Sequence, residues 1–145
     1  MTHGPTVTAS VAPVAVRRLY LANLALLATH QVDAAYWHEW DVFGVPGGLP
    51  VFLVFNLGAV ALLAVGLVRI AEGARTSRAW SLLCAGVGLF TVALHALFLF
   101  LDREAFWAPA SLAVLAGILA TSIGQLLRLP PAVIPSVSPD ARSGR

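Results

Sequence analysis

The stretch AWSLLCAGVGLFTVALHALFLFL, residues 79–101, decides the fold class of this chain, because its 23 consecutive residues carry no formal charge. A helix needs about 20 predominantly apolar residues to cross the hydrocarbon core of a bilayer. Two further charge-free stretches, residues 42–68 and 105–127, pass the same test. The sequence therefore predicts an all-α integral membrane protein.

The composition of the whole chain agrees with this class. Of the 145 residues, 59% are hydrophobic and 11% are charged, and the mean hydropathy is +0.84. Soluble domains carry about 25% charged residues. Nothing in this composition resembles a basic nucleic-acid interface, so we expect no nucleic-acid partner. The single cysteine, Cys84, excludes an intramolecular disulfide and a cysteine-rich zinc or iron–sulfur site.

A fourth, more polar segment follows Arg17 and Arg18, and we expect it to be a retained helix rather than a cleaved signal. The expected helices cover about 18–40, 49–70, 79–101 and 105–127. Residues 1–17 are expected to form a flexible lead, and the proline-rich residues 129–145 a disordered tail. The short connections predict an up-down-up-down bundle of four transmembrane helices.

The arginines predict the orientation of this bundle. Eight of the nine lie on one side of the expected membrane, and only Arg103 lies on the other. Cytoplasmic loops are enriched in arginine and lysine, so we expect a multi-pass protein of the cell membrane with both termini in the cytoplasm. Small residues at four-residue spacing, among them Gly88 and Gly117, predict that helices pack closely within the lipid bilayer.

Ionisable side chains inside the membrane are costly and therefore indicate a functional site. His30 and Asp33 are three residues apart and share one helix face. His95 falls at a similar height in another helix, and Asn56 of the second helix can join them. Closer to the outer membrane boundary than His30 and His95, we expect a mainly acidic surface, which we call the acidic mouth, with Trp37 at the boundary itself. The residues of the acidic mouth are His38, Glu39, Asp41, Asp102 and Glu104.

Three interpretations of these residues remain open at this point. His30, Asp33 and His95 are suitable ligands for a transition metal, and His30 with His95 for a haem; the same three residues can instead position a polar group of a bound lipid-like ligand. Alternatively, Asp33 or Asp102 serves as the general acid of an enzyme that acts on a lipid or isoprenoid. In the third interpretation these side chains only hydrogen-bond to one another, and the protein is a structural or accessory subunit of a membrane complex or a homo-oligomer.

The segment HQVDAAYWHEW, residues 30–40, resembles a group of small bacterial four-helix membrane proteins without assigned function. The shared features are a histidine, an aspartate three residues later, and an aromatic–Glu–Trp run at the end of the first helix. The resemblance implies a membrane protein of uncharacterised role and supplies no catalytic residue. It favours the outer end of the first helix as the location of a shared site.

Overall fold

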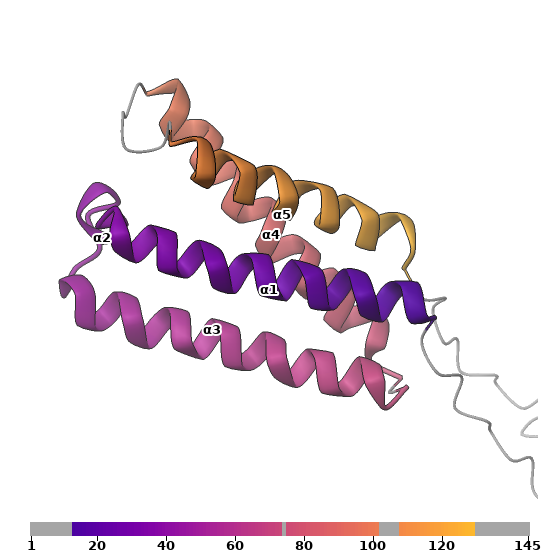
Figure 1. Cartoon of the computed structure of the whole chain (residues 1–145). Coiled ribbons are helices and arrows are strands. Elements are labelled where there is room, and N and C mark those ends of the chain that lie inside the picture. The colour runs from indigo at the N-terminus through magenta and orange to yellow at the C-terminus, as the bar shows by residue number, and fades with distance from the viewer. Residues whose placement is uncertain (1–12, 74, 102–107, 130–145) are drawn as a thin grey trace, which may run out of the picture.

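The computed structural model describes residues 13–73, 75–101 and 108–129, and within these ranges the chain forms five helices and no strand. The helices are α1 (Val14–Tyr36), α2 (Glu39–Val42), α3 (Gly48–Ala71), α4 (Ser77–Phe100) and α5 (Pro109–Leu127). Figure 1 shows the four long helices packed lengthwise, with the short α2 at the end of α1. Helices α1 and α4 each contact all three of the other long helices.

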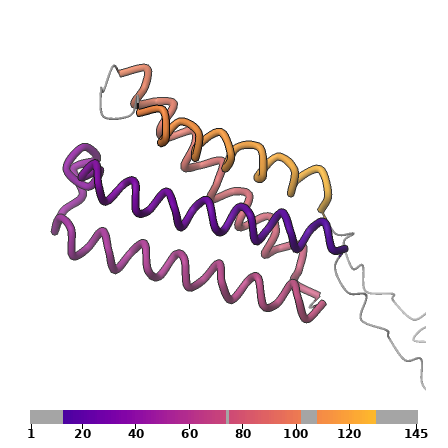
Figure 2. The backbone as a smooth tube through the Cα atoms, in the orientation of Figure 1, coloured from indigo at the N-terminus to yellow at the C-terminus, as the bar shows by residue number. Residues whose placement is uncertain are grey.

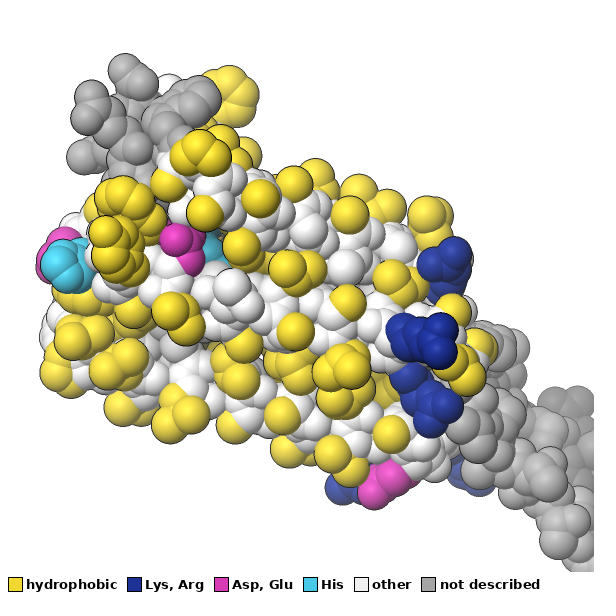
Figure 3. All heavy atoms as spheres, viewed as in Figure 1, with side chains coloured by type: hydrophobic (Ala, Val, Ile, Leu, Met, Phe, Trp, Pro, Cys, Tyr) yellow, Lys and Arg dark blue, Asp and Glu magenta, His cyan; other side chains and the backbone are white. Residues whose placement is uncertain are grey.

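Three of the helices, α3, α4 and α5, are long and apolar enough to cross a membrane. Helix α1 is less apolar than these three, because polar residues such as Asn23, His30 and Asp33 interrupt its sequence. The outer surface of α3 is covered with exposed apolar side chains, among them Val54, Phe55 and Leu57. Apolar side chains extend over the visible face of the molecule in Figure 3, which is the surface that lipid requires.

The first helix differs from its predicted bounds of 18–40. Helix α1 begins at Val14, inside the expected lead, and ends at Tyr36. A continuous helix to residue 40 is wrong because His38 has φ 53° and ψ 43°, a left-handed conformation that cannot continue a right-handed helix. The chain turns there and begins the four-residue helix α2 at Glu39.

The other helices start and end near the residues that the charge-free stretches indicate. Helix α3 covers Gly48–Ala71 where 49–70 is expected, and α4 covers Ser77–Phe100 where 79–101 is expected. Helix α5 begins at Pro109, four residues later than expected. Residues 1–12, 102–107 and 130–145, which include most of the predicted lead and tail, lie outside the described residues.

A buried polar layer joins three of the long helices. Asn23 of α1 donates from Nδ2 to Oε1 of Gln125 at 2.9 Å and to Oγ of Ser122 at 3.0 Å, both on α5. Gly88 of α4 lies against this layer, where a Cβ would collide with Oγ of Ser122. The close approach of α4 to α5 therefore depends on the absence of a side chain at position 88.

The two ends of the molecule differ in charge. Figure 3 shows arginine side chains gathered at one end and histidine at the other. Figure 2 shows that the chain passes from α1 to α3 at the histidine end and from α3 to α4 at the arginine end. The described arginines accordingly fall near helix ends or in the turn between α3 and α4; they are Arg17, Arg18, Arg69, Arg75, Arg78 and Arg128.

Candidate metal centre

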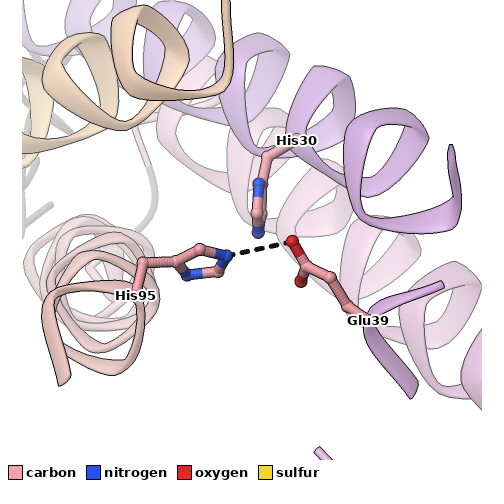
Figure 4. A group of neighbouring side chains, drawn as sticks. All are labelled: His30, Glu39 and His95. Atoms are coloured by element: carbon pink, nitrogen blue, oxygen red, sulfur yellow. Dashed lines mark hydrogen bonds and ion pairs between the residues drawn. The ribbon is translucent and has the colours of Figure 1, made fainter. Parts of the chain in front are cut away.

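Three side chains from three different helices converge at the end of the molecule away from the arginines. They are His30 of α1, Glu39 of α2 and His95 of α4, and each offers one potential ligand atom within 4.8 Å of the others. Only 3–4% of each residue is exposed. Figure 4 shows the two imidazole rings and the carboxylate directed toward a common point.

Helical periodicity places both histidines in the interior. The buried residues of α1 form one stripe along the helix, spaced three or four positions apart except for the adjacent Asn23 and Leu24, and His30 belongs to this stripe: Val16, Tyr20, Asn23, Leu24, Leu27, His30 and Ala34. On α4, His95 follows the buried Gly88 by seven residues, which is close to two helical turns. The two imidazoles therefore meet across the α1–α4 interface, with ring centroids 4.7 Å apart and an interplanar angle of 80°.

The hydrogen bonds of His95 determine which ring nitrogen faces the cluster. Its Nδ1 lies 2.8 Å from the backbone oxygen of Thr91, which can only accept, so Nδ1 carries a hydrogen and donates it. Its Nε2 lies 3.1 Å from Oε1 of Glu39. A histidine that binds a metal through one nitrogen usually donates its other N–H to a carbonyl or carboxylate. His95 already has this arrangement.

His30 contributes a buried imidazole whose Nδ1 has no hydrogen-bond partner among the described residues. Buried polar atoms are nearly always hydrogen-bonded, and leaving one without a partner costs about 1–3 kcal/mol. The presence of a histidine at position 30 is therefore not explained by a hydrogen bond from its Nδ1. The ring tip points toward His95 and Glu39 in Figure 4.

The separation of His95 from Glu39 is suited to a small ion, and the arrangement of the two imidazole rings is not that of haem ligands. Zinc ligands about 2.0–2.2 Å from the metal in a tetrahedral site lie about 3.4 Å from one another. The 3.1 Å separation between His95 and Glu39 is close to that value. Two axial histidines of a haem lie on opposite faces of the macrocycle, whereas the rings of His30 and His95 are in edge contact.

The carboxylate of the cluster is not the one that the helical spacing predicts. Asp33 is only partly buried and is absent from the ligand group, where Glu39 takes its place. Asp33 lies near enough to influence both imidazoles. Its role as a metal ligand stays a prediction, and Glu39 is the carboxylate that the ligand group contains.

The remaining predicted residues lie outside the ligand group. Trp37 and His38 are exposed, and the His38 ring lies beside Trp40 with centroids 4.9 Å apart. Asn56 of α3 is partly buried, and its Nδ2 has no hydrogen-bond partner among the described residues. Asp102, the second candidate general acid, lies outside the described residues.

The fold and the cluster define a class: an all-helical protein with several membrane-competent helices and a buried His–Glu–His group near one end. Residues 16–131 match DUF6713, a family of unknown function, and the chain belongs to this family. The expected membership of an uncharacterised family is thus confirmed, and the match includes His30, Glu39 and His95. No curated protein and no solved structure matches the chain.

Proposed function

We propose that this protein is a multi-pass membrane protein that binds a divalent transition metal ion, zinc in the first instance, through His30, Glu39 and His95. The observation that carries the proposal is the convergence of three potential ligand atoms from α1, α2 and α4 within 4.8 Å, all on buried side chains. Residues so far apart in sequence meet there only because the helices fold together.

The ligand types support zinc. Imidazole nitrogen and carboxylate oxygen are ordinary zinc ligands, and two histidines with one glutamate form the donor set of several zinc sites whose fourth position stays open to water. Charge supports a divalent ion as well. Glu39 and the nearby Asp33 together supply two negative charges beside two imidazoles, which balances a 2+ ion in a setting where unpaired charge is costly.

The same proposal includes four membrane crossings in an up-down-up-down order, with α1 as the fourth. The polar residues Asn23 and His30 of α1 are buried against other helices, so they do not prevent this helix from lying in lipid. The arginine end faces the cytoplasm by the positive-inside rule. Both termini are then cytoplasmic, and the metal centre lies in the outer half of the bilayer.

A purely structural role for the cluster is the main competitor. The hydrogen bond between His95 and Glu39 would by itself attach α2 to α4. His30 favours the metal, because it brings a third potential ligand atom within 4.8 Å of the other two, although the bond between His95 and Glu39 does not need it. A structural polar cluster gains its stability only when its members are satisfied.

Metal binding can be measured on protein purified in detergent without chelators. The protein is equilibrated with zinc, freed of unbound metal, and its zinc content determined by elemental analysis. We expect one zinc ion per chain, and loss of this ion in His30→Ala and in His95→Ala. Leu97→Ala is the matched control, because it truncates an exposed side chain on the same helix as His95.

A second variant separates loss of a ligand from loss of the fold. His95→Gln keeps a side chain that can hydrogen-bond to Glu39 but does not replace imidazole as a zinc ligand. We expect it to keep the helical circular dichroism spectrum and to lose zinc. Absence of zinc from the wild-type protein, or wild-type zinc content in both His30→Ala and His95→Ala, would overturn the proposal.

A further inference from the structure

We infer that His38 is a positioning residue of this site: its left-handed backbone conformation turns the chain so that Glu39 reaches His95. The inference rests on the proposed metal site, and it assigns a role to a residue that is itself exposed and outside the ligand group. The role belongs to the backbone of His38, and the imidazole is not a ligand.

The backbone of His38 is unusual in this chain. Its φ of 53° makes it the one non-glycine residue with positive φ in the part of the chain that the structure describes. The other positive values there belong to glycines, which adopt this conformation without a steric penalty. A residue with a side chain rarely takes it, so the surrounding structure must hold His38 in place.

The geometry explains what the turn achieves. Glu39 follows His30 by nine residues, and in an uninterrupted helix it would lie roughly 180° around the axis, on the opposite face. Helix α1 instead ends at Tyr36, and α2 begins at Glu39 directly after the left-handed residue. This reversal brings the Glu39 carboxylate back to the face of His30, where its Oε1 lies 3.1 Å from His95.

Ring contacts link the turn to α3, and a backbone hydrogen bond closes the turn itself. The ring of His38 lies beside Trp40, and Trp40 packs on Phe52 of α3 with ring centroids 5.3 Å apart. The backbone oxygen of His38 accepts a hydrogen bond from the N–H of Asp41 at 2.9 Å, which closes the first turn of α2. Helix α2 is therefore anchored to α3 while its Glu39 points inward.

Three substitutions at one position separate backbone from side chain. His38→Gly removes the imidazole, and glycine adopts the left-handed conformation without a steric penalty. His38→Asn is the conservative variant, since asparagine also tolerates the left-handed conformation. His38→Val introduces a β-branched side chain that strongly disfavours it. Tyr36→Val is the control, because it places the same residue at an exposed position of regular helix two residues earlier.

The first readout is zinc affinity, measured by competition with a chromophoric chelator. We expect His38→Gly and His38→Asn to stay within about threefold of wild type, and His38→Val to bind at least about tenfold more weakly, because only valine opposes positive φ. Equal losses in the glycine and valine variants would show that the imidazole, and not the left-handed backbone, supports the site, and would overturn the inference. Unchanged affinity in His38→Val would also overturn it.

The second readout does not need metal and so separates this inference from the proposed function. Thermal unfolding midpoints are compared for Glu39→Ala, which removes the contact with His95, made in the wild-type, His38→Gly and His38→Val proteins, all metal-free. We expect Glu39→Ala to lower the midpoint in the first two backgrounds and to have no effect in His38→Val, where Glu39 no longer reaches His95. The same shift in all three backgrounds would show that Glu39 reaches His95 without the turn.

Discussion

Nε2 of His95 lies 3.1 Å from Oε1 of Glu39, although 56 residues separate them in the sequence. Both side chains are 4% exposed, so each would be a costly buried polar group without the other. The contact makes the short helix α2 part of the interior of the protein, joined to α4. It also brings two potential metal ligands to a distance that a small ion can bridge.

Replacing Glu39 by glutamine tests the carboxylate as a ligand. Glu39→Gln preserves the shape of the side chain and its ability to hydrogen-bond to His95, but it removes the negative charge. We expect zinc affinity to fall by more than the 10- to 100-fold typical of losing an outer hydrogen-bond partner of a metal site. Chelator competition measures the change, and Asp41→Asn, an exposed charge removal on the same helix, should leave the affinity near wild type.

Removing the charge of Asp33 should have a smaller effect than removing that of Glu39. Asp33 is partly buried and lies outside the ligand group, so it acts on the ion only through its electric field. Solvent screens such an interaction, and we expect Asp33→Asn to weaken zinc binding by roughly threefold to tenfold. A loss as large as that of Glu39→Gln in the same competition assay would mean that Asp33 is a direct ligand.

Zinc binding should weaken in acid. A protonated imidazole has no lone pair for the metal, so protons compete with zinc for His30 and His95. Affinity should fall by up to about a hundredfold for each unit of decreasing pH once both imidazoles are protonated, and it should level off at higher pH. Competition titrations between about pH 5 and pH 8 measure this. An affinity independent of pH would contradict histidine ligation.

The sequence was most informative where one physical constraint dominates. The charge-free stretch 79–101 predicts a long apolar helix, and α4 covers Ser77–Phe100, because apolar side chains and a hydrogen-bonded backbone leave few alternatives in lipid. The comparison of heights along the helices likewise put His30 and His95 at one level, and their rings lie 4.7 Å apart. The comparison of heights depends only on the regular rise of a helix.

The sequence was least informative where the helix stops. Glu39 was expected in an exposed acidic mouth, because no glycine or proline between residues 30 and 40 signals the turn at His38. Contacts with residues distant in the sequence favour that turn, among them the packing of Trp40 on Phe52 and the bond of Glu39 to His95. The hydrogen bond of Gln125 was not predicted for a related reason: its partner Asn23 lies 102 residues away in the sequence.

The proposed orientation predicts which side each connection faces. A reporter domain fused after Gly47, between α2 and α3, should be active outside the cytoplasm, and one fused after Arg75, between α3 and α4, should be active inside. The reason is the gathering of arginines at the α3–α4 end. Paired reporters that are active on opposite sides of the membrane provide the measurement. The reverse pattern would move the metal centre to the cytoplasmic half.

Packing of α4 against α5 provides a test of stability that is independent of any ligand. In Gly88→Ala the added Cβ would collide with Oγ of Ser122 and come within 3.2 Å of Oδ1 of Asn23, so the buried polar layer must move. Such overpacking typically costs about 1–3 kcal/mol. Gly86→Ala is the matched control two residues away, where a Cβ meets nothing within 4 Å and alanine is the better helix former. We expect the thermal unfolding midpoint in detergent to fall for Gly88→Ala and to stay level or rise for Gly86→Ala. If both variants unfold at the same temperature, the polar layer of Asn23, Ser122 and Gln125 does not control how closely these helices pack.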